Sequence, residues 1–482
     1  MTEAEFSSWL RGQAPRCVLV EVGGLYLSSR AYVTAPDDAV APNRMYQAVV
    51  DGGVAFTESL GLNGAGRASY GDIELTNVEG ALDGWLARVW QKQPVHVYLG
   101  DPSWPRADFR LVMAGVCAGI KTRTPQRLNL VLRDKLERLR GAASEALIGG
   151  TGQNKDRLKP ICLGECHNVS PVAVDTAGET FVWHTGPAER TIEVRDNAVP
   201  VGATQDLAQA KFSLIASPAG QVTASVQGDK TGGVYRNTVG ALVQLLATQY
   251  GPAGERFAAG DLDAANFAAF EAAHPQPVGL FSANRITVHE ACNQLAESVG
   301  AQLAMSRLGT LRLLKLQLPP TGTPREIRPT DYTHGSLKIN DTTDVVAGVR
   351  LGYCRNWTPQ QDIETGIPAA HRDLFGQEWL TVVAKDEAVA VLYGLDTETE
   401  QVNTLLLREQ DAQAEAARRL ALWSVPRTTY SLTGFAQLLT LDLGQAVKLY
   451  GNRFGLDAGK TGVVIGLKSD WIKGRVDVEI IV

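Results

Sequence analysis

Apolar and polar residues alternate with a period of two along much of the first third of the chain. Leucines occupy every second position of residues 127–133, and two valines and a leucine do the same in residues 95–99. Alternation of this kind places the apolar side chains on one face of a strand and is typical of half-buried antiparallel sheets. A short helical spacing of leucines then ends at Gly141. We therefore predict a first β domain over residues 1–148.

A polar, glycine-rich joint at residues 149–155 follows, and the alternation then resumes. Ile192 and Val194 alternate with charged residues, and residues 222–226 alternate small apolar with hydroxyl side chains. These patterns predict further strands, each with an apolar face. We expect a small β domain over residues 156–235.

The apolar period then lengthens to about 3.6 residues, which is the period of a helix. Helical stripes cover residues 239–250, the segment from Asp263 to His274, and residues 288–299. Thr287 and Glu290 have the spacing of a capping box at the start of the third helix. We predict a mixed helix and strand domain over residues 236–330.

Strand patterns return for the last segment, residues 331–482. A longer helix carries Ala412, Ala416, Leu420 and Trp423 and stops before Pro426, and residues 475–480 alternate again. The fold class that follows is mainly β with a mixed α+β middle, and we expect four domains with the boundaries given above.

Composition and charge exclude several classes of protein. The 482 residues are 44% hydrophobic and 20% charged, as expected for a folded, soluble chain, and the net charge of −6 provides no cation excess for nucleic acid or anionic membranes. The start of the chain, Met1 to Cys17, has no uninterrupted apolar stretch, so we expect no secretory signal. No segment approaches the roughly 20 apolar residues of a membrane span. We expect the protein to stay in the cytoplasm where it is made.

The only cysteine pair with suggestive spacing lies in Cys162-Leu-Gly-Glu-Cys166-His167. Three soft ligands within six residues are candidates for a metal site, but zinc and iron–sulfur sites normally use four ligands. The simpler prediction is that alternate strand positions place the thiols in a small core. We predict no metal and no cofactor, with Cys162, Cys166 and His167 as the candidate ligands to check.

Motifs of common enzymes are incomplete in this sequence. Gly459-Lys460-Thr461 lacks the correctly spaced first glycine of a phosphate-binding loop and precedes a predicted strand rather than a helix. His289-Glu290 lacks the second histidine of a zinc-protease helix, because Asn293 stands there. Residues 61–66 do not fit a dinucleotide-binding glycine pattern, and no serine has the glycine spacing of a nucleophile elbow. We predict a turn, a structural histidine and a surface loop, and no catalytic residue.

Two segments have an unbalanced charge. Residues 121–140 are rich in lysine and arginine but lack aromatic residues that would stack on bases, which favours a solvated face over nucleic-acid binding. Residues 361–420 contain twelve acidic and five basic side chains. A segment of that sign is usually a solvated surface, and it also suits a wall that must not hold DNA.

Several stretches, in order along nearly the whole chain, carry a family resemblance. They are Trp85-Leu-Ala-Arg-Val-Trp90, Pro94-Val-His-Val-Tyr-Leu-Gly-Asp101, Phe109-Arg-Leu-Val-Met-Ala-Gly115, Leu128-Asn-Leu-Val-Leu-Arg-Asp-Lys-Leu136, Leu163-Gly-Glu-Cys-His-Asn-Val-Ser-Pro-Val172, Glu193-Val-Arg-Asp-Asn-Ala-Val-Pro-Val201, Tyr353-Cys-Arg-Asn-Trp-Thr358, His371-Arg-Asp-Leu-Phe375, Glu378-Trp379, Leu441-Asp-Leu-Gly444, Arg453-Phe-Gly-Leu-Asp-Ala-Gly459 and Gly474-Arg-Val-Asp-Val478. Together they resemble the baseplate hub family of long, non-contractile phage tails, of the type found in Mu-like siphophages and gene transfer agents. These stretches are strand and turn fingerprints rather than chemical sites.

The resemblance implies a structural virion protein of the tail tip, a homotrimer with two tube-like β-barrels per chain, placed at residues 1–148 and 331–482. Such a hub joins the six-fold tail tube to the three-fold tip and forms part of the channel for DNA ejection. The implied partners are a distal tail protein or tail tube ring, central fibre or tip proteins, the tape-measure protein in the lumen, and DNA in transit. The iron–sulfur cluster of some lambda-like tip proteins is not implied, because this chain lacks the cysteine group.

Two alternatives stay open at this point. A hexameric distal tail ring protein would share the barrel folds, and stoichiometry distinguishes it from a trimeric hub. A tail-tip cell-wall hydrolase would need a pair of carboxylates at a set separation in a cleft, which sequence spacing does not reveal.

Overall fold

A computed structural model describes residues 2–12, 14–52, 54–62, 67–361, 363 and 366–482. The chain divides into two compact units. Unit 1 contains Met1–Glu137, Ala304–Thr343 and Pro426–Val482, and unit 2 contains Arg138–Leu303 and Asp344–Val425. Strands predominate over helices in the described residues, so the fold is mainly β with helices in the middle of the chain, as the sequence predicts.

Unit 1 is built almost entirely of strands. Its elements are α1 (Glu3–Arg11), β1 (Cys17–Val22), β2 (Leu25–Ser28), β3 (Tyr32–Val33), β4 (Met45–Tyr46), β5 (Val50–Gly52), β6 (Ala55–Ser59), β7 (Arg67–Tyr70), β8 (Asp72–Thr76), β9 (Pro94–Gly100), β10 (Arg110–Thr124), β11 (Arg127–Arg133), β22 (Leu311–Lys315), β23 (Arg325–Ile327), β24 (Lys338–Thr342), β28 (Thr428–Phe435), β29 (Ala446–Leu449), β30 (Lys460–Asp470) and β31 (Arg475–Ile481). Short 3₁₀ helices join them: η1 (Val78–Gly80), η2 (Asp83–Ala87), η3 (Arg106–Asp108) and η7 (Ala436–Thr440).

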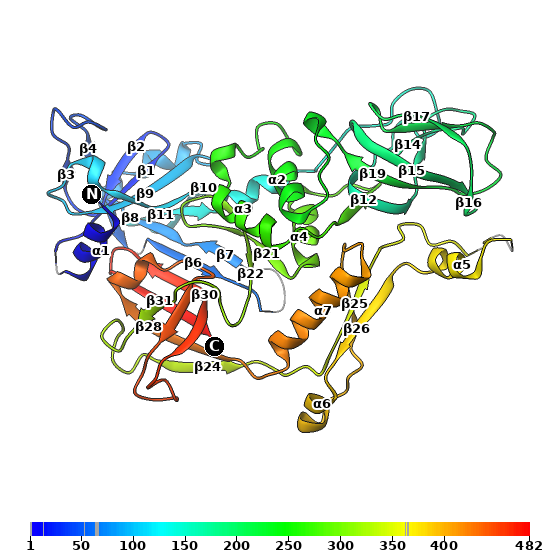
Figure 1. Ribbon diagram of the computed structural model, residues 1–482. Coiled ribbons are helices and arrows are strands. Elements are labelled where there is room, and N and C mark those ends of the chain that lie inside the picture. The colour runs from blue at the N-terminus through cyan, green and yellow to red at the C-terminus, as the bar shows by residue number, and fades with distance from the viewer. Residues whose placement is uncertain (1, 13, 53, 63–66, 362, 364–365) are drawn as a thin grey trace. The chain divides into compact units, whose positions relative to one another are not determined.

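Two large sheets organise unit 1. A seven-stranded sheet has the order β2-β1-β9-β10-β11-β8-β5, and an eight-stranded sheet contains β23-β29-β30-β31-β28-β24 with β6 and β7 attached through β30. Figure 1 shows the first sheet in blue and cyan and most of the second in orange and red. The pairing of β6 with β30 joins residues from opposite ends of the sequence, such as Thr57 and Lys468, which are 411 residues apart. The second sheet is therefore built from both ends of the chain.

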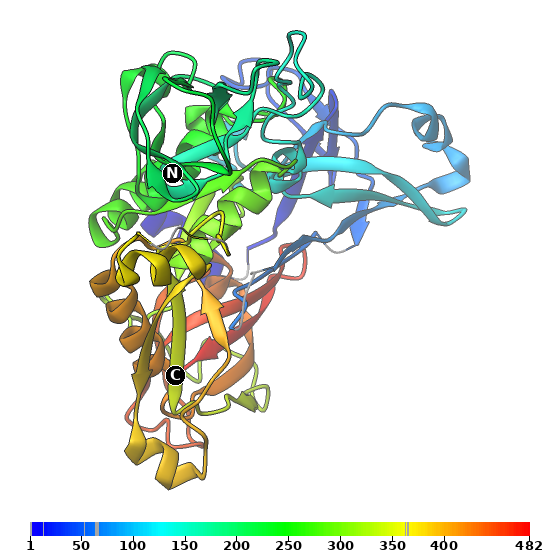
Figure 2. The ribbon, with the colours of Figure 1, turned by 90° about the vertical axis from the view of Figure 1, so that its right-hand side faces the viewer.

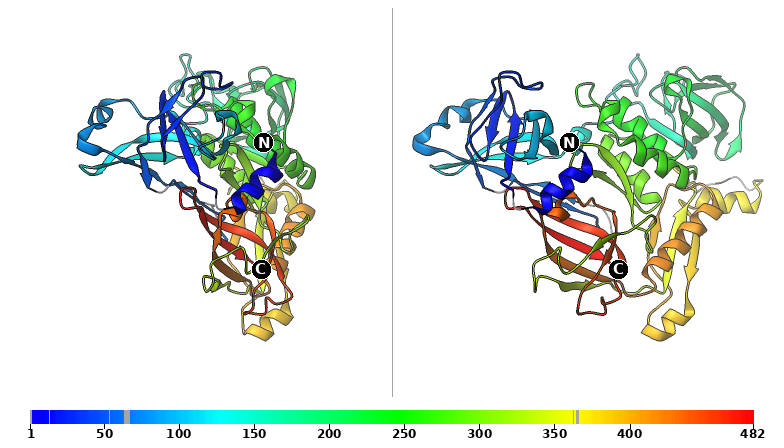
Figure 3. Two further views of the ribbon diagram at one scale, coloured as in Figure 1. Left: turned by 90° about the vertical axis from the view of Figure 1, so that its left-hand side faces the viewer. Right: turned by 60° about the vertical axis from the view of Figure 1, so that its left-hand side comes forward.

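One apolar core serves both sheets of unit 1. It includes Val20 and Leu130 of the first sheet and Val464 and Ile480 of the second, all fully buried. The first helix adds Phe6 and Leu10 to this core, and α1 lies against η7 (Figure 3). The division into two units thus differs from the four predicted segments 1–148, 156–235, 236–330 and 331–482. The physical reason is that the two terminal segments bury their apolar faces against one another.

Unit 2 combines small sheets with most of the helices. Its elements are β12 (Ile161–Val169), β13 (Val172–Ala173), β14 (Thr180–Val182), β15 (Ala188–Asp196), β16 (Val199–Pro200), β17 (Ala203–Asp206), β18 (Lys211–Leu214), β19 (Val222–Asp229), α2 (Val239–Gln249), α3 (Ala264–Ala273), β20 (Gly279–Ser282), α4 (Val288–Ser298), β25 (Gly348–Tyr353), α5 (Ala369–Gly376), β26 (Leu380–Lys385), α6 (Glu387–Tyr393), β27 (Gln401–Asn403) and α7 (Glu409–Trp423), with the 3₁₀ helices η5 (Thr231–Gly233) and η6 (Ala259–Asp261). The boundary between the units falls within η4 (Lys135–Arg140) and β21 (Ala301–Met305).

Three sheets carry unit 2. A five-stranded sheet (β16-β15-β19-β12-β20) and a four-stranded sheet (β13-β14-β18-β17) enclose a core around Trp183 and Phe212. A three-stranded sheet (β26-β25-β27) packs one face on α7, and α6 stands at one end of that sheet (Figure 1).

The predicted helices begin and end close to the expected residues because their signals are local. The structure contains α2, α3, α4 and α7 over the four predicted stretches, and the Thr287–Glu290 capping box is present with both hydrogen bonds. The short helical pattern after residue 132 forms the 3₁₀ helix η4 instead of an α-helix, since Leu132 still belongs to β11.

Two strand patterns differ from a simple alternation. A bulge between Thr191 and Glu193 shifts the register of β15 against β19, so Thr191 is buried and Ile192 is exposed. In β19, Thr223 and Ser225 are buried like their apolar neighbours. The reason is that β19 runs between β15 and β12 in the five-stranded sheet and has both faces covered.

Candidate functional site

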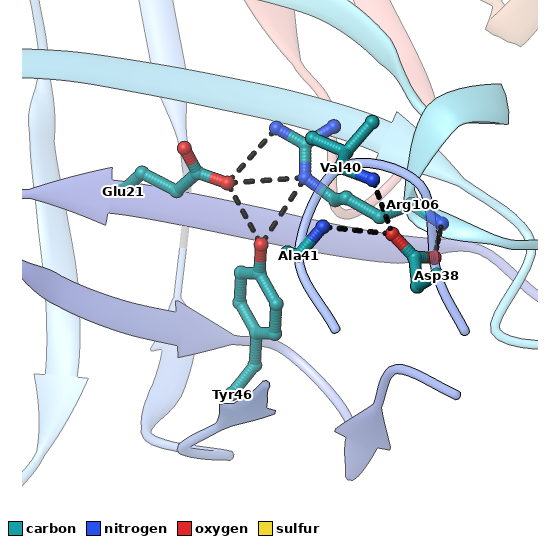
Figure 4. A network of polar contacts seen from close by, with 6 residues as sticks. All are labelled: Glu21, Asp38, Val40, Ala41, Tyr46 and Arg106. Atoms are coloured by element: carbon teal, nitrogen blue, oxygen red, sulfur yellow. Dashed lines mark hydrogen bonds and ion pairs between the residues drawn. The ribbon is translucent and has the colours of Figure 1, made fainter. Parts of the chain in front are cut away.

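The densest polar network in the described part of unit 1 joins strand β1 to the loop that carries β3 and β4 (Figure 4). Arg106 donates from Nε and Nη2 to Glu21 Oε1, at 3.0 and 2.9 Å. Tyr46 donates its hydroxyl proton to the same oxygen at 2.7 Å and accepts from Arg106 Nε at 3.1 Å. The Arg106 guanidinium also lies 3.5 Å from the centroid of the Tyr98 ring. The Arg106 guanidinium is thereby hydrogen-bonded along its edge and packed by its face against the Tyr98 ring.

Burial and charge determine the protonation of this network. Burial acts to lower the pKa of Arg106, but the Glu21 carboxylate and the hydrogen bonds to Glu21 and Tyr46 outweigh it, and the net direction is upward. Burial and the hydrogen bond to Glu21 raise the pKa of Tyr46. The guanidinium therefore stays charged and the phenol stays neutral, an arrangement that positions a loop rather than one that moves protons.

Asp38 anchors the loop that carries β3 and β4 through backbone hydrogen bonds. Its carboxylate accepts from the backbone N–H groups of Val40, Ala41 and Arg106, at 2.9, 2.8 and 2.9 Å. These backbone hydrogen bonds hold the pKa of Asp38 below its usual value. The anchored loop exposes the apolar side chains of Val33, Val40 and Met45. A rigid loop with exposed apolar residues can serve as a contact surface for another protein.

The three candidate metal ligands do not converge. Cys162 and Cys166 are fully buried in one core, and the Cys166 thiol donates to the carbonyl of Leu163 at 3.8 Å. Gly164 lies between them with φ +66°, which interrupts the regular strand. His167 lies on the other side of β12, half-buried, with Nε2 at 3.3 Å from Glu165 Oε1. In the described residues, no three His, Cys, Asp or Glu side chains form a metal-binding group.

A second polar network lies in the core of unit 2, around His184 and Asp229. His184 Nδ1 accepts from the backbone N–H of Cys162 at 3.0 Å, so the neutral ring carries its proton on Nε2, which lies 3.4 Å from Asp229 Oδ2. Tyr250 donates to the same carboxylate oxygen at 2.6 Å, and Thr231 donates from its backbone and its hydroxyl at 2.8 and 2.9 Å.

These donors decide the charge of Asp229. Burial acts to raise its pKa, but the hydrogen bonds from His184, Tyr250 and Thr231 outweigh burial and lower the pKa to about 2. A histidine next to a carboxylate resembles part of a catalytic triad. Here both side chains are almost wholly inaccessible, at 0% and 2% exposure, and a substrate cannot reach them in this conformation.

A third buried carboxylate, Glu58 of β6, lies in unit 1. Burial raises its pKa to about 8, with Arg307 and Arg312 opposing that direction and Asp442 adding to it. Arg307 is itself bound to Asp442 Oδ1 at 2.7 Å and to the carbonyl of Leu441 at 2.8 Å. The Arg307 guanidinium is thus bound to Asp442 and Leu441. Among the described carboxylates of unit 1, Glu58 has the largest upward shift of its pKa.

An apolar cavity of about 720 Å³ lies in unit 2. Its walls come from β15, β16 and the segment around α5, and include Val199, Pro200, Ile367, Leu374 and Phe375. Arg195 closes its polar end with the guanidinium 4.8 Å from the Phe375 ring and bonded to Asn168 at 2.9 Å. Such a cavity fits an apolar group, and Glu193 and His371 are the other polar side chains beside Arg195 in its lining.

The enzyme-like motifs occupy structural positions. Lys460 and Thr461 begin strand β30, which follows the turn after β29, so the predicted turn and strand are confirmed. His289 lies on α4 with Nδ1 3.4 Å from the side-chain nitrogen of Asn293. The loop at residues 61–66 lies outside the described residues from Asn63 onward.

The two charged segments are mostly solvated, as the sequence predicts. Of the basic stretch, Arg123 and Arg127 pair with Glu74, and Arg133 pairs with Glu137 at 3.1 Å. Among the described acids of the acidic stretch, Glu415 is the buried exception, and it is bound by two arginines, Arg418 and Arg419.

Sequence spacing did not reveal the Glu21–Arg106 and His184–Asp229 networks. Glu21 and Arg106 are 85 residues apart, and His184 and Asp229 are 45 apart. The one available signal was a charged residue inside an otherwise apolar strand, as with Glu21 in Cys17–Val22. That signal identifies one partner and not the other.

No protein-family profile matches this chain, and no curated protein matches it. Among solved structures, it is similar to the 43 kDa tail protein of prophage MuSo2 from Shewanella oneidensis, with 12% identity, a TM-score of 0.41, and coverage of 97% of this chain and 98% of that one. The tail protein from Neisseria meningitidis MC58 gives 11% identity and a TM-score of 0.41, over 97% of each chain. A chain of the native gene transfer agent virion gives 14% identity and a TM-score of 0.41, over 71% of this chain and 90% of that one. At these scores the likenesses carry no conclusion about this protein.

Membrane insertion through a helix has no candidate in the described chain, since none of its helices combines sufficient length with sufficient hydrophobicity.

Proposed function

We propose that this chain is a structural protein of a phage tail tip, a trimeric baseplate hub that joins the tail tube to the tip and surrounds part of the DNA channel. Its proposed partners are copies of itself, a distal tail or tube ring, central fibre or tip proteins, and the tape-measure protein. Its proposed location is the virion tail tip, after assembly in the host cytoplasm.

The observation that carries this proposal is the construction of unit 1. Residues from both ends of the chain form two large sheets around one core. The family resemblance implies two tube-like barrels per chain, placed in those two terminal segments. Three copies with two such modules each present six similar surfaces to a six-fold tube. The order of the resembling stretches, from Trp85 to Val478, supports the same assignment.

A non-enzymatic role is part of the proposal. The side chains of Glu21, Arg106 and Asp229 are each hydrogen-bonded by neighbours in a way that positions backbone and side chains. A structural protein needs such groups to orient loops and strands. We assign no catalytic, cofactor-binding or metal-binding residue.

The acidic surplus of residues 361–420 fits a channel or partner surface in this role. Repulsion between carboxylates and phosphate keeps DNA from adhering to a wall. Charge reversal of exposed acids in this segment should slow tail assembly or DNA ejection, and intact assembly and ejection would contradict this part of the proposal.

Copy number and location test the main proposal. We expect light scattering of purified protein to give a trimer, and electron microscopy of intact tails to place three copies at the distal end of the tube. A hexameric ring at that position would favour a distal tail protein instead. Absence from particles, together with clearing of peptidoglycan by the pure protein, would favour a cell-wall hydrolase.

A further inference from the structure

Helix α6 of unit 2 exposes an unusual amount of apolar surface. Val391 and Leu392 are 84% and 75% exposed, and Tyr393 and Leu395 beside them are also exposed. Figure 1 shows α6 at the far end of the three-stranded sheet, away from α7. We call residues 386–400 the acidic tip. Exposed clusters of large apolar residues usually mark a contact with another protein.

Carboxylates surround this apolar cluster. Asp386, Glu387, Asp396, Glu398 and Glu400 lie in the tip, and no lysine or arginine occurs between Lys385 and Arg408. All of these acids are at least partly exposed. A partner for the tip must therefore combine apolar side chains with positive charge.

Unit 1 carries a surface of that kind on a projecting arm. The arm consists of the far part of the β10–β11 hairpin, residues 119–127, and the segment 77–92 that lies along it (Figure 2). Asn77 bonds the carbonyls of Pro125 and Gln126 through its side chain and backbone, and the backbone N–H of Lys92 bonds the carbonyl of Cys117. These bonds tie the segment to the hairpin at both ends.

The arm exposes both apolar and basic side chains. Val78 and Val89 are 62% and 76% exposed, and Leu86 is exposed between them. The arm contains five basic and two acidic residues, namely Arg88, Lys92, Lys121, Arg123, Arg127, Glu79 and Asp83. Glu74 and Asp51 pair with Arg127, and Glu74 also lies 3.7 Å from Arg123, which partly neutralises the two arginines beside the hairpin turn. Arg88, which precedes Val89 in the sequence, bonds the neutral carbonyl of Gly23, and Lys121 is exposed, so both cations keep their charge on the arm.

We propose that the acidic tip of one copy of this chain docks on the basic arm of a second copy. Each surface has an exposed apolar centre, and their rims have opposite charge. Neither surface suits a contact with its own kind, because like charges would face one another. The contact is therefore head-to-tail, and repetition around an axis closes it into a ring. This inference rests on the self-association in the proposed function and adds which two surfaces make it.

Solution association of the full chain tests the contact. The tip variant carries Val391→Ser, Leu392→Ser and Glu398→Lys, and the arm variant carries Val89→Ser, Arg88→Glu and Lys121→Glu. Sedimentation should show each variant associating at least about tenfold more weakly than the unmodified chain, as for loss of central contacts in an interface. Ile215→Ser is the matched control, because Ile215 is 79% exposed in unit 2 but lies outside the tip.

Mixing the two variants provides the decisive measurement. The tip variant keeps an intact arm and the arm variant keeps an intact tip, so an equimolar mixture should form a one-to-one heterodimer although neither variant forms rings alone. Circular dichroism spectra that match the unmodified chain establish that both variants are folded.

Three outcomes overturn the inference. They are unchanged association of the tip and arm variants, a mixture that contains only monomers, and an unmodified chain that stays monomeric at about 100 μM. Failure of this contact can be distinguished from failure of the proposed function, because the copy number in particles is measured separately. Three copies at the tube end with fully assembling tip and arm variants would retain the hub and reject this contact.

Discussion

Each unit buries a carboxylate, and the pKa values of the two move in opposite directions. Glu58 of unit 1 has its pKa raised to about 8, whereas Asp229 of unit 2 has its pKa lowered to about 2. Both side chains are nearly inaccessible, at 4% and 2% exposure. Burial acts upward on both pKa values. The difference comes from the donors, since Asp229 accepts short hydrogen bonds from Tyr250 and Thr231, while Arg307, whose charge opposes the rise of the Glu58 pKa, is bound to Asp442.

Depth of burial by itself does not decide whether a carboxylate stays charged. Hydrogen-bond donors directed at the carboxylate decide it. Glu21 is a third carboxylate with directed donors. It is partly buried and accepts hydrogen bonds from the Arg106 guanidinium and the Tyr46 phenol. The contribution of each carboxylate to stability should follow its donors.

The largest expected effect is the loss of the arginine that holds Glu21. Arg106→Ala leaves Glu21 with Tyr46 alone and should lower the free energy of unfolding of unit 1 by about 4 kcal/mol, as for a broken buried ion pair. Amide hydrogen exchange of peptides from β1 measures this for unit 1 by itself.

Two further variants sharpen the Arg106 result. The double variant Glu21→Gln with Arg106→Ala should lose less than Arg106→Ala, because no uncompensated charge is left. Arg453→Ala, at an exposed position of the same unit, should have little effect. An equal loss in the single and double variants would contradict the role of the charge.

The next effect concerns Glu58 and depends on pH. Its raised pKa means that its contribution to stability is fully present below its ordinary value of 4.5 and is lost as the pH rises toward 8. Glu58→Gln should therefore stabilise unit 1 by about 3 kcal/mol near pH 7 and change little near pH 4. Hydrogen exchange of β6 and β30 peptides at both pH values measures this difference.

The control for Glu58 is Asp457→Asn, which removes an exposed carboxylate from the same unit. That variant should show no pH-dependent difference from the unmodified chain. A destabilising Glu58→Gln at neutral pH would mean that Arg307 or Arg312 holds the ionised carboxylate in place.

For Asp229 the sign is reversed. Its lowered pKa gives a contribution that is present above the ordinary value of 3.8 and is lost as the pH falls toward 2. Asp229→Asn should destabilise unit 2 by about 2 kcal/mol at neutral pH and remove the part of acid unfolding that lies between these values. Peptides of β19 report the change by hydrogen exchange, and Asp156→Asn, at an exposed position, is the matched control.

The smallest expected effect is that of a single donor to Asp229. Tyr250→Phe removes the 2.6 Å hydrogen bond and should lower the stability of unit 2 by about 1 kcal/mol while shifting its acid transition to higher pH. Tyr393→Phe, at an exposed tyrosine, should change neither quantity. An unshifted acid transition in Tyr250→Phe would show that the other donors suffice.

Several elements were predictable because their signals are local. The capping box of Thr287 and Glu290, the leucine alternation of β11 and the apolar stripe of α2 each depend on residues within one or two turns or within one strand. The mainly β fold class follows from such patterns added along the chain. The bulge that exposes Ile192 was not predictable from such patterns, because it arises from the pairing of β15 with β19.

The candidate site was predictable only in part. Cys162 and Cys166 were expected together in a small core, and they do share one, while His167 lies on the opposite side of the strand. Arg106 and His184, which lie beside Glu21 and Asp229, were not expected there, because they are 85 and 45 residues away along the chain.

By itself, the sequence determined the mainly β fold class, several helices and strands with approximate bounds, and the charge of the acidic and basic segments. Only the tertiary structure decided that both chain ends share one core and that Glu58 and Asp229 have opposite pKa shifts. The physical reason is that helices and strands follow from neighbouring residues, whereas the burial and hydrogen-bond donors of a charged group come from segments that only folding brings together.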